Sequence, residues 1–316
     1  MRPLFTAIGS WLPYLGIVAP RSTRCSRQAK PEPKSCSRIA ISDNRRQWNR
    51  FIGSPGSLAV VALCVPILLH AQLHTQRLKP DGHRDNGFVF CRLQYTKVRS
   101  EPDGSGWTTD FPFADRNFMT RFSELTTAPV DFDEDGDPRH WVANVSNPVS
   151  DALSTCPFVI ASDVGTLEFS DGDIDRIRAY LLKGGFLWVD DFWGPAAWSF
   201  WAIEIGRVLP PREYPIRDVP PDHALRRGMY LVDVPQIAHI GFWSSTGGST
   251  SERGDDSAEV HFRMITDRDD RIMVLMTHNT DIQDAWEREG NNQFFAAFAA
   301  DGYSVGLNVM LYAMTH

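Results

Sequence analysis

The sequence has few cysteines and lacks the motifs that usually mark a metal centre. Of its five cysteines, only Cys91 and Cys156 lie beyond the first 64 residues. The absence of a CxxC pair, a cysteine and histidine cluster and an HExxH motif excludes the common zinc sites. We therefore expect no metal ligands and no cofactor. Cys91 and Cys156 adjoin apolar runs, so we expect two buried free thiols, or a disulfide if the compartment is oxidising and their strands are adjacent.

Positive charge is scarce in most of the chain. Residues 1–57 contain ten Lys and Arg and two Asp and Glu, which leaves 22 basic and 37 acidic residues in the rest. Clustered basic residues are needed to bind a nucleic-acid backbone, so we expect no nucleic-acid partner. Residues 1–57 are rich in Arg, Ser and Pro, which predicts a disordered extension or a start codon assigned too early.

A short apolar run, LAVVALCVPILL at 58–69, follows Arg45, Arg46 and Arg50 and precedes HAQ. A membrane-spanning helix needs roughly 20 apolar residues, more than this run has. The pattern is typical of a secretory signal at 58–71 with cleavage after Ala71, followed by a linker at 72–86. It predicts an exported protein, periplasmic or secreted, that meets a membrane only through an uncleaved leader. The alternatives are a retained anchor and a buried helix.

Strand and helix patterns alternate through residues 87–316, which we expect to form a single domain. Apolar runs predict strands at 88–95, 141–145, 156–163 and 186–190. Helices are predicted after Asp115, which is placed to cap the first, after Ser170, which forms a capping box with Asp173, and from Pro195. Runs at 259–266 and 271–279 predict a hairpin, and 301–316 a terminal helix. The fold class is therefore α/β, a three-layer sandwich with a mainly parallel, doubly wound sheet and a C-terminal hairpin and helix.

The segment GGFLWVDDFWGP, Gly184 to Pro195, predicts a strand, a tight turn and the start of a helix. Several hydrolase folds present a nucleophile on such a turn, one or two residues before the closing glycine. Here those positions are Phe192 and Trp193, and neither side chain can attack a carbonyl. The nearest nucleophile is Asp191. A second hypothesis is that Asp191 caps the following helix.

Ligands of an open parallel sheet bind beyond the carboxyl ends of its strands. We therefore select residues that follow the predicted strands or lie in the loop after the first strand. These candidate ligand-binding residues are Asp110, Asp115, Arg116, Asp163, Asp190, Asp191, His278 and Asn279. Asp163, one of the adjacent pair Asp190 and Asp191, and His278 could form an oxygen-rich cation site or an acid and base set.

Several dispersed segments resemble a bacterial family, domain of unknown function 4159. They are FVFCRLQY, GWTTDFPFADRNF, IRAYLLKGGFLWVDDFWG, PPDHALRRGMY, HNTDIQDAWE and VGLNVMLYAMTH, which span about residues 87–316. The resemblance implies a flavodoxin-like fold similar to that of class I glutamine amidotransferases. Those enzymes have a cysteine on the turn after the glycine pair, where this sequence has Phe192. Glutaminase activity is therefore not expected, since fold alone does not bring function.

Two functional hypotheses fit these patterns. The first is a non-catalytic domain that binds a small molecule or an envelope protein at the carboxyl edge of its sheet. The second is a hydrolase of an envelope glycan or ester, metal-assisted or based on a carboxylate and a histidine. This hydrolase would use Asp110, Asp163, Asp191 and His278, so it predicts that these four side chains converge in one cleft.

Overall fold

A computed structural model describes residues 87–147 and 152–316. The predicted leader, signal and linker, residues 1–86, lie outside the described residues. The strands are β1 (Phe90–Gln94), β2 (Thr96–Lys97), β3 (His140–Asn144), β4 (Phe158–Ser162), β5 (Leu167–Glu168), β6 (Phe186–Asp190), β7 (Arg217–Asp218), β8 (His261–Thr266) and β9 (Ile272–His278). The α-helices are α2 (Phe113–Leu125), α3 (Asp171–Leu182), α4 (Gly194–Val208), α5 (Ile240–Ser245), α6 (Asp284–Glu287) and α7 (Asn292–Thr315).

Seven strands form one sheet in the order β3-β1-β4-β6-β9-β8-β7, and β2 pairs with β5 separately. The first five strands of this order run parallel to one another. Strand β8 is antiparallel to β9 and to β7, so the predicted hairpin is confirmed. Because parallel strands end at the same edge, the carboxyl ends of β1, β4, β6 and β9 meet on one side of the molecule.

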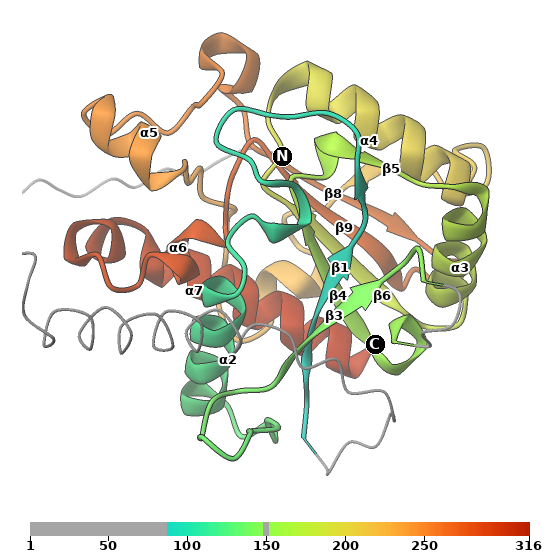
Figure 1. Cartoon of the computed structure of the whole chain (residues 1–316), viewed down its shortest axis with the longest axis horizontal. Helices are drawn as coiled ribbons and strands as arrows, with labels where there is room; N and C mark the ends of the chain where they lie inside the picture. The colour runs from blue at the N-terminus through green and yellow to red at the C-terminus, as the bar shows by residue number, and fades with distance from the viewer. Residues whose placement is uncertain (1–86, 148–151) are drawn as a thin grey trace, which may run out of the picture. The chain divides into compact units, whose positions relative to one another are not determined.

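Helices cover both faces of the sheet, which confirms the predicted three-layer α/β arrangement (Figure 1). One face packs against α3 and α4 through side chains such as Ile177 and Trp201. The other packs against α2, α6 and α7 through Phe118, Trp286 and Val309. Strands β4, β6 and β9 are buried along their whole length. A strand covered on both faces needs a continuous run of apolar residues, which is why the sequence predicted these strands.

The predicted cap is present at the start of α3 and absent at the start of α2. Ser170 and Asp173 form the predicted capping box at the start of α3. The prediction that Asp115 caps α2 was wrong, because the helix begins before it, at Phe113, and no side-chain hydrogen bond caps it among the described residues. Asp115 instead points into the core, where its carboxylate accepts hydrogen bonds from the buried Arg92.

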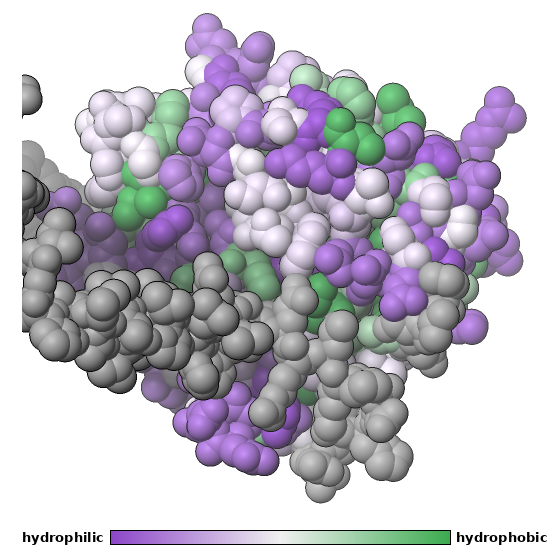
Figure 2. Space-filling model, in the orientation of Figure 1, coloured by the Kyte–Doolittle hydropathy of each residue, from purple (hydrophilic) through white to green (hydrophobic). Residues whose placement is uncertain are grey.

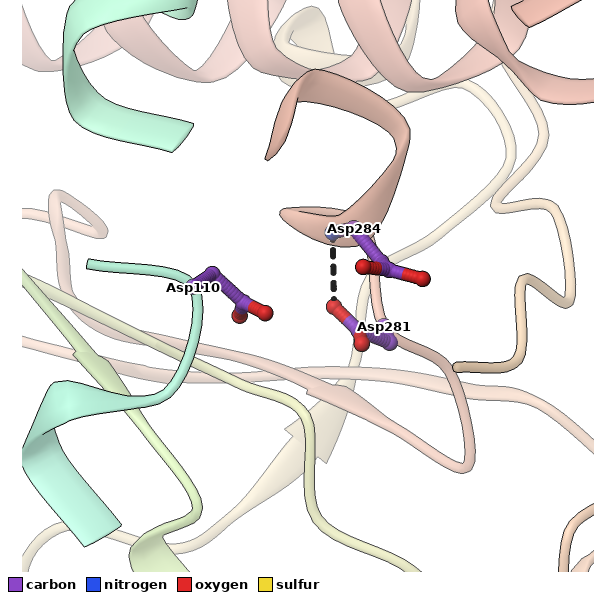
Figure 3. A group of neighbouring side chains, drawn as sticks. All are labelled: Asp110, Asp281 and Asp284. Carbon is purple, nitrogen blue, oxygen red and sulfur yellow. Dashed lines mark hydrogen bonds between the residues drawn. The ribbon is translucent and has the colours of Figure 1, made fainter. Parts of the chain in front are cut away.

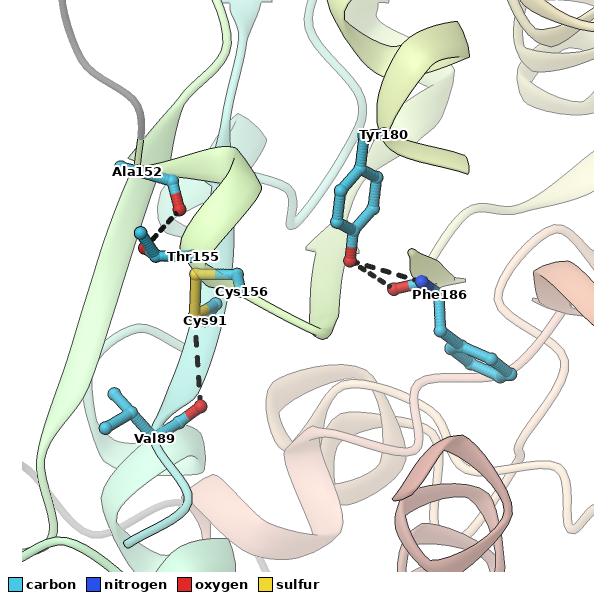
Figure 4. The surroundings of a disulfide bond; sticks show 7 residues. All are labelled: Val89, Cys91, Ala152, Thr155, Cys156, Tyr180 and Phe186. Atoms are coloured by element: carbon cyan, nitrogen blue, oxygen red, sulfur yellow. Dashed lines mark hydrogen bonds between the residues drawn. A yellow bond between two sulfur atoms is a disulfide. The ribbon is translucent and has the colours of Figure 1, made fainter. Parts of the chain in front are cut away.

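Cys91 and Cys156 form a disulfide, so the expectation of two free thiols was wrong (Figure 4). Cys91 lies on β1 and Cys156 lies two residues before β4, its neighbour in the sheet. This adjacency brings the two Cα atoms to 6.0 Å, within the range that a disulfide requires. Nearby, the Tyr180 hydroxyl donates to the carbonyl of Phe186 and accepts from its amide, which ties α3 to the start of β6.

Helix α7 is long and apolar enough to cross a membrane by length and composition, and it is the one helix of the described residues that meets this test. Of the 18-residue stretch of α7 that meets this test, 56% is buried inside the fold. Val305, Val309 and Tyr312, within the predicted terminal helix, are buried. On the face shown in Figure 2, hydrophobic residues form small groups among hydrophilic ones. Phe200 and Ile203, both on α4, are exposed large hydrophobic residues.

Candidate functional site

Three neighbouring strands end in the same way at the carboxyl edge. The residue after each of β4, β6 and β9 has a left-handed backbone: Asp163 with φ 51°, Asp191 with φ 53° and Asn279 with φ 64°. Asp and Asn adopt this conformation more readily than other residues with a side chain. The Asp163 amide donates to the Asp191 carbonyl, and the Asp191 amide donates to that of Thr280. These bonds hold the strand ends together and fix where the acidic side chains emerge.

A fully buried arginine organises the space next to these strand ends. Arg92 lies on β1, faces α2 and has no exposed surface. Its guanidinium is bonded to both carboxylate oxygens of Asp115, and it also donates to the Thr109 carbonyl, to Ser162 Oγ and to Gln283 Oε1. All five guanidinium N–H groups therefore have acceptors. Such saturation is what permits a charge to be buried in a core.

Asp190, the last residue of β6, extends this network. Thr277 Oγ1 donates to its Oδ1 over 2.5 Å, and the Gln283 amide donates to its Oδ2 over 3.1 Å. Gln283 Nε2 also bonds to Ser162 Oγ, which links Asp190 to Arg92. Complete burial raises the pKa of Asp190 to about 7, although these hydrogen bonds oppose the rise. Asp190 is therefore held in place and titrates near neutrality.

Further carboxylates from separate segments gather beside Asp190. We define the acid cluster as Asp110, Asp190, Asp191, Asp281, Asp284 and Glu287. Asp110 comes from the loop before α2, and the last three come from the segment that follows β9 (Figure 3). Asp110, Asp281 and Asp284 each present an oxygen within 4.8 Å of the others. The cluster is thus built by three segments that lie far apart in the sequence.

The acid cluster brings several carboxyl groups together in a buried place. Burial raises the pKa of Asp110, and the neighbouring Asp284 and Glu287 raise it further. Burial and the charge of Asp110 likewise raise the pKa values of Asp191 and Asp281. Removal from water and repulsion between like charges both disfavour the ionised carboxylate. Groups perturbed in this way are typical of functional sites.

Asp191 does not cap α4. Its Oδ1 accepts a hydrogen bond from Trp193 Nε1 over 3.0 Å. The amide of Gly194, at the start of α4, is instead bonded to Oδ1 of Asn279 over 2.7 Å. The capping hypothesis for Asp191 was wrong because Asn279, after the adjacent strand, reaches the helix start. The side chain of Asn279 therefore holds the start of α4.

Other predicted residues lie elsewhere. Arg116 bonds to Asp137 on the outer side of α2, so it does not belong to the edge. Asp163 accepts from the Gly106 amide, and burial raises its pKa to about 6. His278 lies on the opposite face of the sheet, against Phe192 and Trp198. Its Nε2 bonds to the Gly194 carbonyl, and burial lowers its pKa to about 3.

The predicted convergence of Asp110, Asp163, Asp191 and His278 is therefore only partial. Asp163 and Asp110 act on Asp191, and both raise its pKa, whereas His278 interacts with His261 and Arg263 instead. The acids of the segment after β9 and Arg92 were missed by sequence reasoning. A charged residue within the apolar run FVFCRLQY was a signal for Arg92. Acids in HNTDIQDAWE, shortly after the last parallel strand, were a signal for the others.

Comparison with protein families supports the resemblance seen in the sequence. The family model described as "Domain of unknown function (DUF4159)" matches residues 89–314. This match covers most of the chain, so the chain belongs to that family. The family description assigns no activity. No curated protein matches the chain.

Proposed function

We propose that this member of the family is an exported, non-catalytic domain that binds a positively charged ligand at the carboxyl edge of its sheet. The observation that carries the proposal is the acid cluster. Six carboxylates lie together there, and the guanidinium groups that act on them are those of Arg92 and Arg288. Arg92 is already paired with Asp115. A bound cation would favour the ionised carboxylates, which burial and mutual repulsion otherwise disfavour.

The turn after β6 supports binding over catalysis. We propose that the fold is of the class I glutamine amidotransferase type, in which this turn would carry the nucleophile. Here the turn carries Phe192, which is buried against Trp198 and His278. The hydrolase hypothesis also needed His278 beside the acids. With His278 on the other face and its pKa lowered to about 3 by burial, it is a poor base for a reaction at the acid cluster.

Export is part of the same proposal. It is supported by the signal pattern at 58–71 and by the Cys91–Cys156 disulfide, since disulfides persist in oxidising compartments. Amino-terminal sequencing of the exported protein should begin at Gln72. Recovery of the intact chain from the cytosol would contradict export without affecting the proposed ligand site.

Ligand binding is tested by thermal unfolding of the full chain with cationic probes. Spermidine, arginine amide, CaCl2, MgCl2 and MnCl2 are compared with NaCl at matched ionic strength. At least one probe should raise Tm, because a ligand that binds only the folded state stabilises it by mass action. The rise should shrink in Asp191→Asn, which keeps the acceptor for Trp193 but loses the charge. Equal Tm values with every probe would refute the proposed function.

Catalysis is tested in parallel on the same two proteins. Multiple-turnover hydrolysis of p-nitrophenyl esters or glycosides by the wild type, lost in a folded Asp191→Asn variant, would contradict a binding function. We expect the wild type and the variant to give the same background rate.

A further inference from the structure

The Asp110, Asp281 and Asp284 carboxylates, which we call the aspartate triad, differ from the rest of the acid cluster in their mutual arrangement. Each offers an oxygen, and these oxygens lie within 4.8 Å of one another. In Figure 3 the carboxylate of Asp110 points toward Asp281, across from the start of α6. Oxygens on opposite sides of a Ca²⁺ ion are about 4.8 Å apart, given metal–oxygen distances of about 2.4 Å. The triad therefore has the spacing of ligands around one ion.

Asp110 supplies a second and independent observation. Its side chain is buried, with 6% of its surface exposed, and its Oδ2 atom has no hydrogen-bond partner among the described residues. A buried carboxylate oxygen without a donor is costly, since it has lost its water and gained nothing. In Figure 3 the Asp110 side chain is directed toward the two other carboxylates. A cation between them would supply the missing partner.

The other two members are positioned by the backbone. Asp281 Oδ1 accepts from the Asp284 amide over 2.8 Å, and Asp284 accepts from the Ile240 amide and from Arg288 Nε. Each carboxylate oxygen has two acceptor positions, so these bonds leave room for a metal ion. They also hold both carboxylates in fixed orientations. Such outer contacts orient the ligands of a metal site.

From this geometry we infer that the aspartate triad binds one hard divalent cation of the Mg²⁺, Mn²⁺ or Ca²⁺ class. The inference rests on the proposed function and names the ligand of that same site. The ligand set is all oxygen, which favours these ions over Zn²⁺ or Cu²⁺. Burial of the three side chains, at 6%, 1% and 0% exposure, favours a small ion over an organic cation.

Cation binding is measured on the full chain after treatment with EDTA and dialysis. Isothermal titration with each chloride gives stoichiometry and affinity, and loss of the Mn²⁺ resonance signal reports binding directly. We expect one ion per chain. A saturating cation should raise Tm by about 5 °C or more at about 100 times its Kd. No binding of any of the three ions at millimolar concentration would overturn the inference.

Asp110→Asn tests the triad itself. The variant keeps the shape and tolerates the left-handed backbone at φ 64°, but it removes one charge, so affinity should fall at least about tenfold. Asp103→Asn is the matched control, because Asp103 is exposed and has φ 62°. It should bind like the wild type. In EDTA, Asp110→Asn should be at least as stable as the wild type, which separates lost binding from lost folding.

Asp281→Asn serves as a second variant, since its amide oxygen can still accept from Asp284. Wild-type affinity in both Asp110→Asn and Asp281→Asn would overturn the inference. The outcome also separates this inference from the proposed function. If spermidine raises Tm in an Asp191-dependent way while divalent ions do not bind, the triad inference fails and the proposed function stands. If no probe binds, both fail.

Discussion

The two ends of the parallel strands differ in the interactions they contain. At the amino end, the Cys91–Cys156 disulfide joins β1 to the segment before β4, and Tyr180 bonds to both backbone groups of Phe186 (Figure 4). At the carboxyl end, three strands turn out of the sheet through left-handed residues and bring buried carboxylates together. The amino end is held by covalent and hydrogen bonds, whereas the carboxyl end gathers buried carboxyl groups whose ionised form burial and mutual repulsion disfavour. On the proposed function, the first end holds the fold together and the second binds the ligand.

The Arg92 network lies next to the carboxyl ends of the strands, and Asp115→Ala should have the largest effect. Loss of the carboxylate leaves a fully buried guanidinium without its charged partner, which costs about 3–5 kcal/mol of unfolding free energy. Urea unfolding followed by tryptophan fluorescence measures the loss. Asp137→Ala removes the exposed partner of Arg116 and should cost less than about 1 kcal/mol. Similar losses of unfolding free energy in both variants would show that the buried Arg92–Asp115 pair stabilises the fold no more than the exposed Arg116–Asp137 pair.

Removal of the disulfide tests the amino end alone. The double variant Cys91→Ala and Cys156→Ala should lose about 2–4 kcal/mol, because the bond closes a loop with a sequence separation of 65 residues. Its affinity for divalent cations should not change. Dithiothreitol should lower the Tm of the wild type and leave that of the double variant unaltered. A change in cation affinity would mean that the two ends are not independent.

His278 lies at the carboxyl end on the face opposite the acid cluster, and it should make the unfolding free energy depend on pH. Its folded pKa is about 3, below the ordinary value of 6.5, so it must stay neutral in the fold. The stability it provides is complete above pH 6.5 and falls as the pH decreases toward 3. Relative to His278→Gln, the wild type should lose about 2 kcal/mol between pH 7 and pH 5. Parallel pH profiles of unfolding free energy would contradict the burial of a neutral imidazole.

The smallest effect is expected from Asp191→Asn, and its sign is the informative part. Burial and the neighbouring Asp110 raise the pKa of Asp191, so replacing this carboxyl by a neutral amide should stabilise the cation-free protein at pH 8. Asp103→Asn, at an exposed left-handed position, should change stability by less than about 0.5 kcal/mol. Chemical denaturation in EDTA provides the measurement. A loss of stability in Asp191→Asn would mean that the carboxylate supports the fold.

Much of the architecture was predictable from local patterns. Strand β6 and the capping box of α3 were found because an apolar run and the pair Ser170 and Asp173 act over a few residues. The edge at which Asp163, Asp190 and Asp191 emerge was also predictable, since parallel strands share a direction. The errors at Asp115 and Asp191 have one cause. Each side chain had a local capping role available, but a residue distant in sequence decided the outcome: Asp115 pairs with Arg92, and Asn279 binds the Gly194 amide in place of Asp191.

The sequence by itself determined the main alternation of strands and helices, the position of the turn after β6 and the presence of Phe192 and Trp193 where such a turn would carry a nucleophile. These features depend on residue type and short-range spacing. Only the tertiary structure decided which acids share one site, because Asp110 and Asp281 are 171 positions apart and meet only when the loop before α2 packs beside the segment after β9. It also placed His278 on the opposite face, since neighbouring residues of a strand point to opposite sides. The type of each side chain is set by the sequence, but which ionisable side chains become neighbours in a site depends on how distant segments pack together.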